Sequence, residues 1–198
     1  MNDPLLYVNE TYEAIQGEGA LTGTPMHLIR LQGCNLRCPW CDTKQTWDRA
    51  DTGIPMTNEE LLAQVRLDWI LLTGGEPLLQ PVEHFIAAAR AIGKRVAIET
   101  NGTLSCADRA DWMCVSPKVG TTISRSAWAM ANEIKMVVER EEDLTWFNAL
   151  LASMPTTNGI FSLQPASQDP GATTLCIREV IERRWRLSIQ THKYLSLP

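Results

Sequence analysis

The strongest candidates for reactive chemistry in this sequence are three cysteines in one short segment, Cys34, Cys38 and Cys41. Their spacing is C-x3-C-x2-C. Structural zinc normally takes four protein ligands, commonly from two C-x2-C pairs. Three close thiolates without a matching second pair are instead typical of an iron–sulfur cluster that leaves one iron open for a substrate or cofactor. The spacing therefore favours a cluster over a structural zinc site.

A glycine-rich segment, Thr73-Gly74-Gly75-Glu76-Pro77, follows the cysteines further along the chain. Glycine has no Cβ, so the two glycines allow backbone amides and carbonyls to approach a ligand closely. Glu76 offers a carboxylate for an ammonium group. By itself this segment would be an ordinary turn after a strand, but beside the cysteines it indicates a second part of a cofactor site.

These segments must be positioned by regular elements. Apolar runs that end in polar or glycine-bearing residues predict strands at 26–31, 69–72, 95–98, 112–115, 133–138, 159–163 and 185–189. A capping box at Thr57 and Glu60 predicts a helix start. Helical spacing of apolar residues predicts further helices at 82–92, ended by Gly93, at 144–154 and at 172–184.

Apolar strands that alternate with amphipathic helices indicate parallel β-α units, whose chemistry lies where the strands end. Strands buried on both faces read as continuous apolar runs, as these do. About six or seven strands are too few for a full eight-fold barrel of ~250 residues. We therefore predict an α/β fold: a shortened, open partial TIM barrel of mostly parallel strands, with its site at the carboxyl-terminal rim.

Composition excludes several classes of protein. The chain has 198 residues, of which 44% are hydrophobic and 21% charged, so it is neither a disulfide mini-scaffold nor a disordered tail. The net charge of −5 argues against a nucleic-acid partner. No apolar run approaches the ~20 residues of a membrane span. The first residues also lack the basic segment followed by an apolar segment that is typical of a signal peptide. We expect a cytoplasmic protein without a membrane partner.

The cysteine motif followed by the Gly-Gly-Glu-Pro segment resembles the radical S-adenosylmethionine (SAM) superfamily. The resemblance implies one radical SAM domain over residues 1–198, with the superfamily's open partial barrel. It also implies a 4Fe–4S cluster on Cys34, Cys38 and Cys41, whose fourth iron chelates SAM. One electron would cleave SAM to methionine and a 5′-deoxyadenosyl radical, which abstracts a hydrogen atom from the substrate.

Within that superfamily the chain resembles the 7-carboxy-7-deazaguanine synthases over nearly its whole length. Gln16-Gly17-Glu18-Gly19 and Thr191-His192-Lys193-Tyr194 are the most discriminating motifs. The resemblance implies that 6-carboxy-5,6,7,8-tetrahydropterin becomes 7-carboxy-7-deazaguanine, with ring contraction and loss of ammonia, in 7-deazapurine and queuosine biosynthesis. It also implies a requirement for Mg²⁺.

The resemblance assigns roles residue by residue. Arg30 would pair with the substrate carboxylate, because a guanidinium fork suits that anion. Thr43 would be the Mg²⁺ ligand, and the terminal carboxylate of Pro198 would bind the guanidine-like edge of the pterin. The other implied substrate-binding residues are Ile15, Gln16, Gly17, Glu18, Thr73 and Glu99. The implied SAM-binding residues are Trp40, Cys41, Asp42, Gly75, Glu76, Ser116, Pro117, Lys118, Gln164 and Pro165.

One departure concerns the residues after Pro165, where the family pattern has Met-Asp and this chain has Ala166 and Ser167. The resemblance further implies a homodimer and a reductant protein of the flavodoxin or ferredoxin type. Two alternatives remain. Another radical SAM enzyme, such as an activase that installs a glycyl radical on a partner protein, would share the cysteines and the glycine segment. A zinc-bound interaction module would complete its site with Cys114, Cys106 or His192.

Overall fold

The computed structural model describes residues 4–106 and 109–195, which divide into two compact units. Among these residues, unit 1 comprises the chain up to Ala14, Pro25–Thr100 and Cys106–Met113. Unit 2 comprises Ile15–Thr24, Asn101–Ser105 and the chain from Cys114 onward. The expectation of a single domain over the whole chain stays a prediction.

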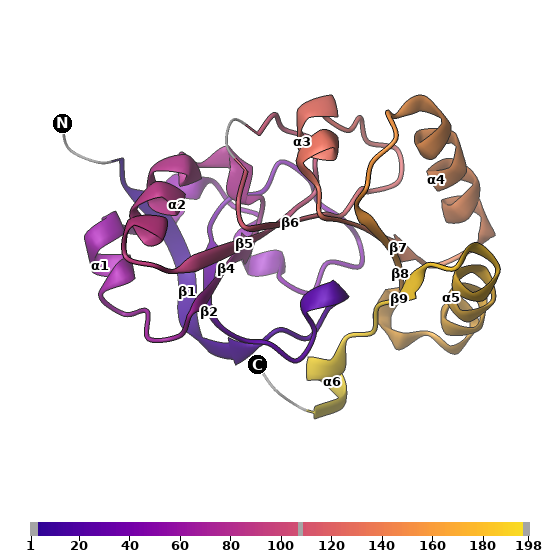
Figure 1. Cartoon of the computed structure of the whole chain (residues 1–198), viewed down its shortest axis with the longest axis horizontal. Helices are drawn as coiled ribbons and strands as arrows, with labels where there is room; N and C mark the ends of the chain where they lie inside the picture. The colour runs from indigo at the N-terminus through magenta and orange to yellow at the C-terminus, as the bar shows by residue number, and fades with distance from the viewer. Residues whose placement is uncertain (1–3, 107–108, 196–198) are drawn as a thin grey trace. The chain divides into compact units, whose positions relative to one another are not determined.

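Unit 1 combines five strands with two helices. The strand order is β3-β1-β2-β4-β5, in which β2, β4 and β5 run parallel and β3 is antiparallel to β1. Helices α1 and α2 lie side by side against these strands (Figure 1). The elements are β1 (Leu6–Ile15), β2 (Pro25–Leu31), β3 (Ile54–Met56), α1 (Asn58–Leu62), β4 (Trp69–Gly74), α2 (Val82–Ala91) and β5 (Arg95–Thr100), with 3₁₀ turns η2 (Lys44–Thr46), η3 (Ala50–Thr52) and η4 (Pro77–Leu79).

The core of unit 1 lies between its strands and its two helices. Ile29, Leu72 and Ile98 of β2, β4 and β5 belong to one fully buried apolar cluster with Phe85 of α2. Successive side chains of a strand point to opposite faces. The residues that follow or precede these core positions therefore face away from the helices, and this places three predicted site residues on one face: Arg30, Thr73 and Glu99.

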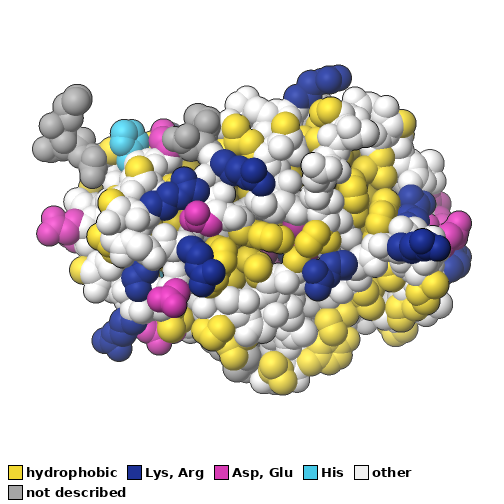
Figure 2. Space-filling model, in the orientation of Figure 1, with side chains coloured by type: hydrophobic (Ala, Val, Ile, Leu, Met, Phe, Trp, Pro, Cys, Tyr) yellow, Lys and Arg dark blue, Asp and Glu magenta, His cyan; other side chains and the backbone are white. Residues whose placement is uncertain are grey.

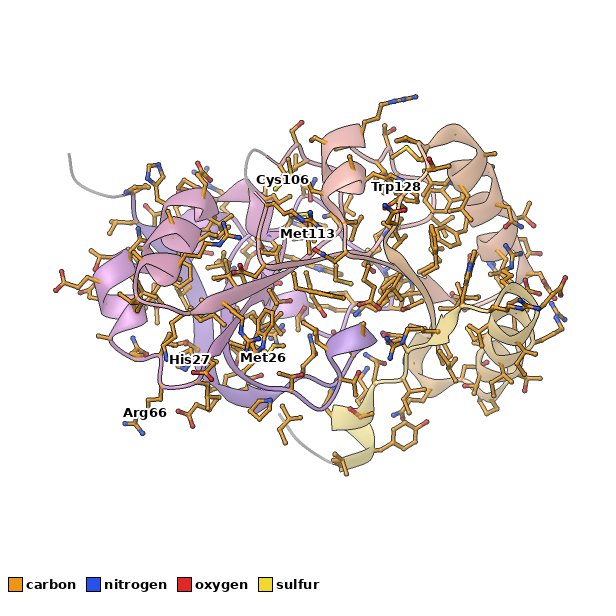
Figure 3. The ribbon with its side chains drawn as sticks, viewed as in Figure 1. Met26, His27, Arg66, Cys106, Met113 and Trp128 are labelled. Carbon is orange, nitrogen blue, oxygen red and sulfur yellow. The ribbon has the colours of Figure 1, made fainter. Side chains whose placement is uncertain are left out.

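Buried polar groups also occur in unit 1, next to the apolar core. His27 of β2, labelled in Figure 3, is buried, and its Nε2 lies 2.8 Å from the Thr11 hydroxyl. Its Nδ1 has no hydrogen-bond partner among the described residues. Burial lowers the pKa of His27, and the nearby Glu13 acts in the opposite direction. Burial of this imidazole therefore favours its neutral form.

Unit 2 contains β7, β8, β9 and the last two residues of β6, Cys114 and Val115, in the parallel order β6-β7-β8-β9. Helices α4 and α5 flank these strands, whereas α6 lies beside the η1 turn (Figure 1). The stacked rings of Phe161 and Trp185, with Trp128 and Phe147 against them, form its aromatic core. The elements are η1 (Gly19–Leu21), β6 (Trp112–Val115), α3 (Arg125–Met130), β7 (Glu133–Val138), α4 (Glu141–Ser153), β8 (Ile160–Pro165), η5 (Ala166–Gln168), α5 (Pro170–Arg183), β9 (Arg186–Leu187) and α6 (Thr191–Leu195).

The predicted α/β fold of mostly parallel strands is confirmed, and neither set of strands closes into a barrel. All seven predicted strands are present, although the last is shortened to Arg186–Leu187. The four predicted helices are α1, α2, α4 and α5, and the capping box of Thr57 and Glu60 forms with both of its hydrogen bonds. The sequence patterns did not predict β1, β3, α3 or α6. No helix in the described ranges is long and apolar enough to cross a membrane.

Candidate cofactor and substrate site

The three clustered cysteines lie on one loop of unit 1, residues 34–43, which we call the thiol loop. None of the three is in a disulfide, and each residue is only partly buried. The Cys41 amide donates to the Cys38 carbonyl (3.0 Å), which makes a tight turn at the C-x2-C part of the motif. The Leu36 amide lies 3.4 Å from Cys34 Sγ and donates to it.

The thiol loop begins where β2 ends, and the end of β4 is hydrogen-bonded directly to it. The Gly75 amide donates to the Leu31 carbonyl (3.1 Å), and the Glu76 amide donates to the Gly33 carbonyl (2.8 Å). A Cβ on Gly75 would lie 1.9 Å from the Gly33 oxygen, so only glycine fits. We attributed the two glycines to the approach of a ligand, and the structure shows that they also allow two strand ends to meet.

Glu76 is fully buried at this junction. One of its carboxylate oxygens accepts hydrogen bonds from the Leu78 amide (3.0 Å) and from the Thr100 hydroxyl (2.6 Å). The carboxylate therefore caps the η4 turn and is fixed beside the thiol loop. Since an ammonium group is the natural ligand of such a carboxylate, this position suits the role that the sequence predicts for Glu76.

The donor set of the thiol loop fits an iron–sulfur cluster. Three cysteine thiols, a close backbone amide and a partly exposed surface are what such a cluster requires. Burial raises the pKa of Cys34, and nearby Glu76 raises it further, so ligation must displace a proton from this thiol. Among the described residues, no three His, Cys, Asp or Glu side chains are grouped closely enough to hold a bare metal ion.

The other predicted ligands in this loop lie next to the cysteines. The Thr43 hydroxyl is 3.6 Å from Cys41 Sγ, and the Thr43 carbonyl accepts from the Thr46 hydroxyl (2.8 Å). Trp40 is half-buried, and Asp42 is exposed. Thr43 precedes the η2 turn without capping it through its side chain, which leaves its hydroxyl beside the thiol.

Arg30 lies on the non-core face of β2, directly paired in register with Thr73 of β4. Its Nε donates to Glu10 (2.6 Å), and its side chain is 14% exposed. Burial alone would lower the pKa of the guanidinium, but hydrogen bonds to Glu10 and Tyr12 raise it. Unit 1 therefore presents a fixed cation on the same face as Thr73 and Glu99, which suits a carboxylate ligand.

The other predicted substrate residues lie in unit 2, immediately after Ile15, in what we call the 16–19 loop. Gln16 is buried, and its side-chain oxygen accepts from the Glu18 amide (3.1 Å). The Gly17 carbonyl accepts from both the amide (2.9 Å) and the hydroxyl (3.0 Å) of Thr191 in α6. A Cβ on Gly17 would lie 2.1 Å from the His192 ring. The two most discriminating sequence motifs are therefore in direct contact.

Unit 2 also carries the predicted SAM-binding residues that follow β6 and end β8. The Lys118 ammonium donates to the Ser116 hydroxyl (2.7 Å), with Pro117 between them. Gln164, which precedes Pro165, accepts from the Ser188 hydroxyl (2.7 Å) and also hydrogen-bonds Glu18. The Gln164 side chain thus contacts the 16–19 loop.

Sequence reasoning missed the residues that fix this loop. Glu133 of β7 accepts from the amide of Ala20, the residue directly after the loop, and Lys135 of β7 contacts Glu18. Ser188 and Gln190 contact the loop from the segment after β9. A signal was present, because Glu133 and Lys135 are charged residues two positions apart in an otherwise apolar strand, and so share one face. Both are almost completely buried.

The end of the chain is only partly within the structure. Pro198 lies outside the described residues, and α6 is the last described element. Tyr194 and Leu195 are exposed, and Thr191 and His192 make the contact between α6 and the 16–19 loop. His192 packs against Gly17, and Cys106 and Cys114 are buried.

Comparisons with known proteins agree with this geometry. The profile of the Radical SAM superfamily matches residues 28–124, which include the thiol loop and the glycine segment. A 7-carboxy-7-deazaguanine synthase of Escherichia coli (strain K12) is 36% identical, covering 96% of this chain and 98% of its own length. One of Bacteroides thetaiotaomicron is 37% identical, covering 96% and 97%. The crystal structure of QueE from Escherichia coli superposes with a TM-score of 0.87 at 35% identity, covering 95% of both chains. The chain belongs to the 7-carboxy-7-deazaguanine synthase family of the radical SAM superfamily.

Proposed function

We propose that this chain converts 6-carboxy-5,6,7,8-tetrahydropterin to 7-carboxy-7-deazaguanine with ring contraction and loss of ammonia, a step of 7-deazapurine and queuosine biosynthesis. The observation that carries the proposal is the contact of the 16–19 loop with Thr191 and His192. The resemblance to this family depends most on those two segments, and in this chain they are in direct contact.

Cofactor binding in this proposal begins at the thiol loop. Cys34, Cys38 and Cys41 hold the 4Fe–4S cluster, and Glu76 binds the ammonium group of SAM. When bound, the cluster and SAM supply the radical that abstracts a hydrogen atom from the substrate. The remaining residues that the resemblance assigns to SAM are Trp40, Asp42, Gly75, Ser116, Pro117, Lys118, Gln164 and Pro165.

In this proposal, a cationic side chain binds the carboxylate of the substrate, and hydrogen-bonding side chains bind its ring. Arg30 binds the pterin carboxylate through its guanidinium fork. Gln16 and Glu18 read the hydrogen-bond donors and acceptors of the pterin edge, and Pro198 adds its terminal carboxylate. Ile15, Gly17, Thr73 and Glu99 complete this proposed set.

Mg²⁺ binding at Thr43 is also part of the proposal. A hydroxyl is a hard oxygen ligand, and Mg²⁺ commonly completes its octahedron with waters and substrate oxygens. The position of the Thr43 hydroxyl beside Cys41 Sγ supports this assignment. Thr43→Ala should raise the Mg²⁺ concentration needed for half-maximal turnover without changing the iron content, and an unchanged requirement would contradict the role.

The test of the proposed function is anaerobic turnover. Reconstituted protein with SAM, Mg²⁺, a reductant and the carboxy-tetrahydropterin should release the deazapurine product and ammonia, detected by mass spectrometry. Arg30→Lys should raise the substrate dissociation constant while SAM binding stays unchanged, because lysine cannot reproduce the fork. Protein with a full cluster and bound SAM that forms no deazapurine would contradict the proposal.

A reductant protein of the flavodoxin or ferredoxin type is the proposed electron donor. Arg37 and Lys44, both exposed, lie 5.9 and 5.7 Å from the ring centroid of Trp47, near the thiol loop. Exposed cations of this kind favour encounter with an acidic partner. Reversing both charges should slow reduction by the protein donor but not by dithionite, and equal slowing of both would contradict this surface.

A homodimer in the cytoplasm completes the proposal. Hydrophobic side chains gather over α5 and α6 (Figure 2). The exposed apolar residues of this region are Ile177, Ile181, Leu187, Ile189, Tyr194 and Leu195. Ile181→Glu should shift the sedimentation of the protein toward a monomer, whereas an unchanged dimer would exclude this surface. None of the six cysteines forms a disulfide, which is consistent with a reducing compartment.

A further inference from the structure

A buried lysine of unit 2 is paired with a residue of the 16–19 loop. Lys135 of β7 is 3% exposed, and its ammonium contacts Glu18 Oε2. The Glu18 side chain is 18% exposed. A lysine is rarely buried to this extent unless it is paired with an anion. The pair is therefore a specific feature of this loop and not a surface ion pair.

The second oxygen of the Glu18 carboxylate is also held from within unit 2. Gln190 Nε2 donates to Glu18 Oε1 (2.8 Å), and Gln190 is itself fixed by the Lys193 ammonium (2.9 Å). Gln164 of β8 adds another hydrogen bond to the Glu18 side chain. Donors on three sides thus set the direction in which the remaining lone pairs of this carboxylate point.

The loop backbone is fixed by other residues. Glu133 accepts from the Ala20 amide (2.9 Å) and from the Ser162 hydroxyl (2.5 Å). The Gly19 amide donates to the Ser188 hydroxyl (2.8 Å), and Thr191 binds the Gly17 carbonyl. Removing the Lys135 ammonium therefore leaves these backbone contacts of the loop in place.

We propose that Lys135 is a positioning residue that keeps Glu18 an ionised, fixed acceptor, so that the 16–19 loop selects substrates presenting neutral N–H donors, such as the amino and ring N–H groups of a pterin. This inference deepens the proposed function and rests on it. An ionised carboxylate only accepts hydrogen bonds, whereas a protonated one carries a competing O–H donor.

The charges around Glu18 explain why the lysine is needed. Burial alone would raise the pKa of Glu18, but the charge and hydrogen bond of Lys135, with the hydrogen bonds of Gln190 and Gln164, lower it to about 2. The other ionisable groups on the elements packed against this loop are Glu133 of β7 and His192 and Lys193 of α6. Without Lys135, burial would dominate and Glu18 would take up a proton closer to neutral pH.

The test uses the holoenzyme with SAM and Lys135→Met, with Lys135→Arg as the conservative control. The dissociation constant of 6-carboxy-5,6,7,8-tetrahydropterin is measured by anaerobic calorimetry between about pH 5.5 and 8.5, and expressed as the ratio of variant to wild type, which cancels titration of the ligand. We expect Lys135→Met to weaken binding about tenfold at the upper end, equivalent to about 1.4 kcal/mol. The ratio should rise further as the pH falls, and Lys135→Arg should restore most of the affinity.

Two further measurements make the result decisive. KM should rise in Lys135→Met while kcat changes little. In a Glu18→Gln background the same lysine substitution should produce no pH-dependent ratio, since an amide does not titrate. An unchanged affinity, or a loss that is equal at every pH, would overturn the inference.

A direct readout of Glu18 separates this inference from the proposed function. Infrared difference spectra between high and low pH should show a protonated carboxyl in Lys135→Met that is absent from wild type and from the double variant Glu18→Gln, Lys135→Met. Wild-type protein with a full cluster that binds no pterin would contradict the proposed function. No protonated Glu18 in Lys135→Met would overturn the role of Lys135, whatever the ligand.

Discussion

The thiol loop of unit 1 and the 16–19 loop of unit 2 are fixed in opposite ways. The thiol loop is positioned by backbone hydrogen bonds between Gly33 and the glycine segment, where the absence of a side chain is the requirement. The 16–19 loop is positioned mainly by buried polar side chains of β7 and of the segment after β9. Cofactor binding therefore depends on close backbone packing, whereas the proposed substrate loop depends on paired charges.

The largest effect on iron content and turnover should follow from filling the contact between the two strand ends. In Gly75→Ala the new Cβ would lie 1.9 Å from the Gly33 oxygen, so β4 and the thiol loop must separate. We expect a loss of about 3 kcal/mol of stability and of most of the iron, with no turnover. Iron and sulfide analysis after reconstitution measures this. Gly93→Ala is the control for adding a methyl group without a clash: nothing lies within 4 Å of its Cβ, and its left-handed backbone (φ +78°) costs about 1 kcal/mol, so stability should fall slightly while the iron content stays normal. A variant at Gly75 with normal iron would contradict the packing argument.

Removing a buried polar side chain that positions the 16–19 loop should weaken binding of the substrate without changing binding of the cofactor. Glu133→Leu leaves the Ala20 amide and the Ser162 hydroxyl without their acceptor in a buried site. We expect a stability loss of about 4 kcal/mol, because each unsatisfied donor is costly, and a large loss of pterin affinity at normal iron content. Thermal unfolding and calorimetry measure both. Glu139→Gln, at an exposed position beyond the same strand, should change neither, and equal loss of iron in Glu133→Leu would remove the distinction between the loops.

Low pH should reduce the stability of the protein, because protonation of Glu18 removes its ion pair with Lys135. Because the folded-state pKa is lowered from 4.5 to about 2, the pair with Lys135 contributes its full stability above pH 4.5 and loses it as the pH falls through about 2. The contribution is about 3 kcal/mol. Urea unfolding of cluster-free protein at a series of pH values should show a shallower acid dependence in Glu18→Gln than in wild type. Parallel curves would show that the pair adds no stability.

The smallest effect concerns the neutral histidine of unit 1. Since burial lowers the pKa of His27, the unfolded chain binds its proton more readily, and stability should decrease as the pH falls below the ordinary value of 6.5. His27→Leu should remove this dependence while leaving the acid dependence due to Glu18 intact. Chemical unfolding between about pH 5 and 8 measures it, and an identical slope in both proteins would exclude the effect.

Sequence patterns predicted the elements that have a local signal, such as an apolar run or a helix cap. The capping box of Thr57 and Glu60 and the apolar runs of the central strands have local causes, so both were visible. Strand β1 was missed because much of it meets polar partners: Asn9 with Gln32, Glu10 with Arg30, and Thr11 with His27. Such cross-strand pairs become recognisable only once the two strands are adjacent.

Of the candidate site, the sequence predicted the local motifs but not the contacts between residues that are distant in the sequence. The cysteine spacing and the glycine segment are local motifs, and so they were found. The clash that excludes a side chain at Gly75, and the pairing of Glu18 with Lys135, join residues far apart in the sequence. No local pattern records which strand end or which lysine will be the neighbour. Charged residues inside an apolar strand are the nearest sequence signal for the second case.

The space beside Gly17 is taken by the ring of His192, although 175 positions separate them in the sequence. Substitutions at positions 17 and 192 should therefore be coupled during evolution. An alanine at 17 becomes tolerable where 192 has first shrunk to a small residue, and a lineage that alters one alone must displace the α6 helix. Among many aligned sequences, the pair should leave a trace of correlated substitution that neither position would show by itself.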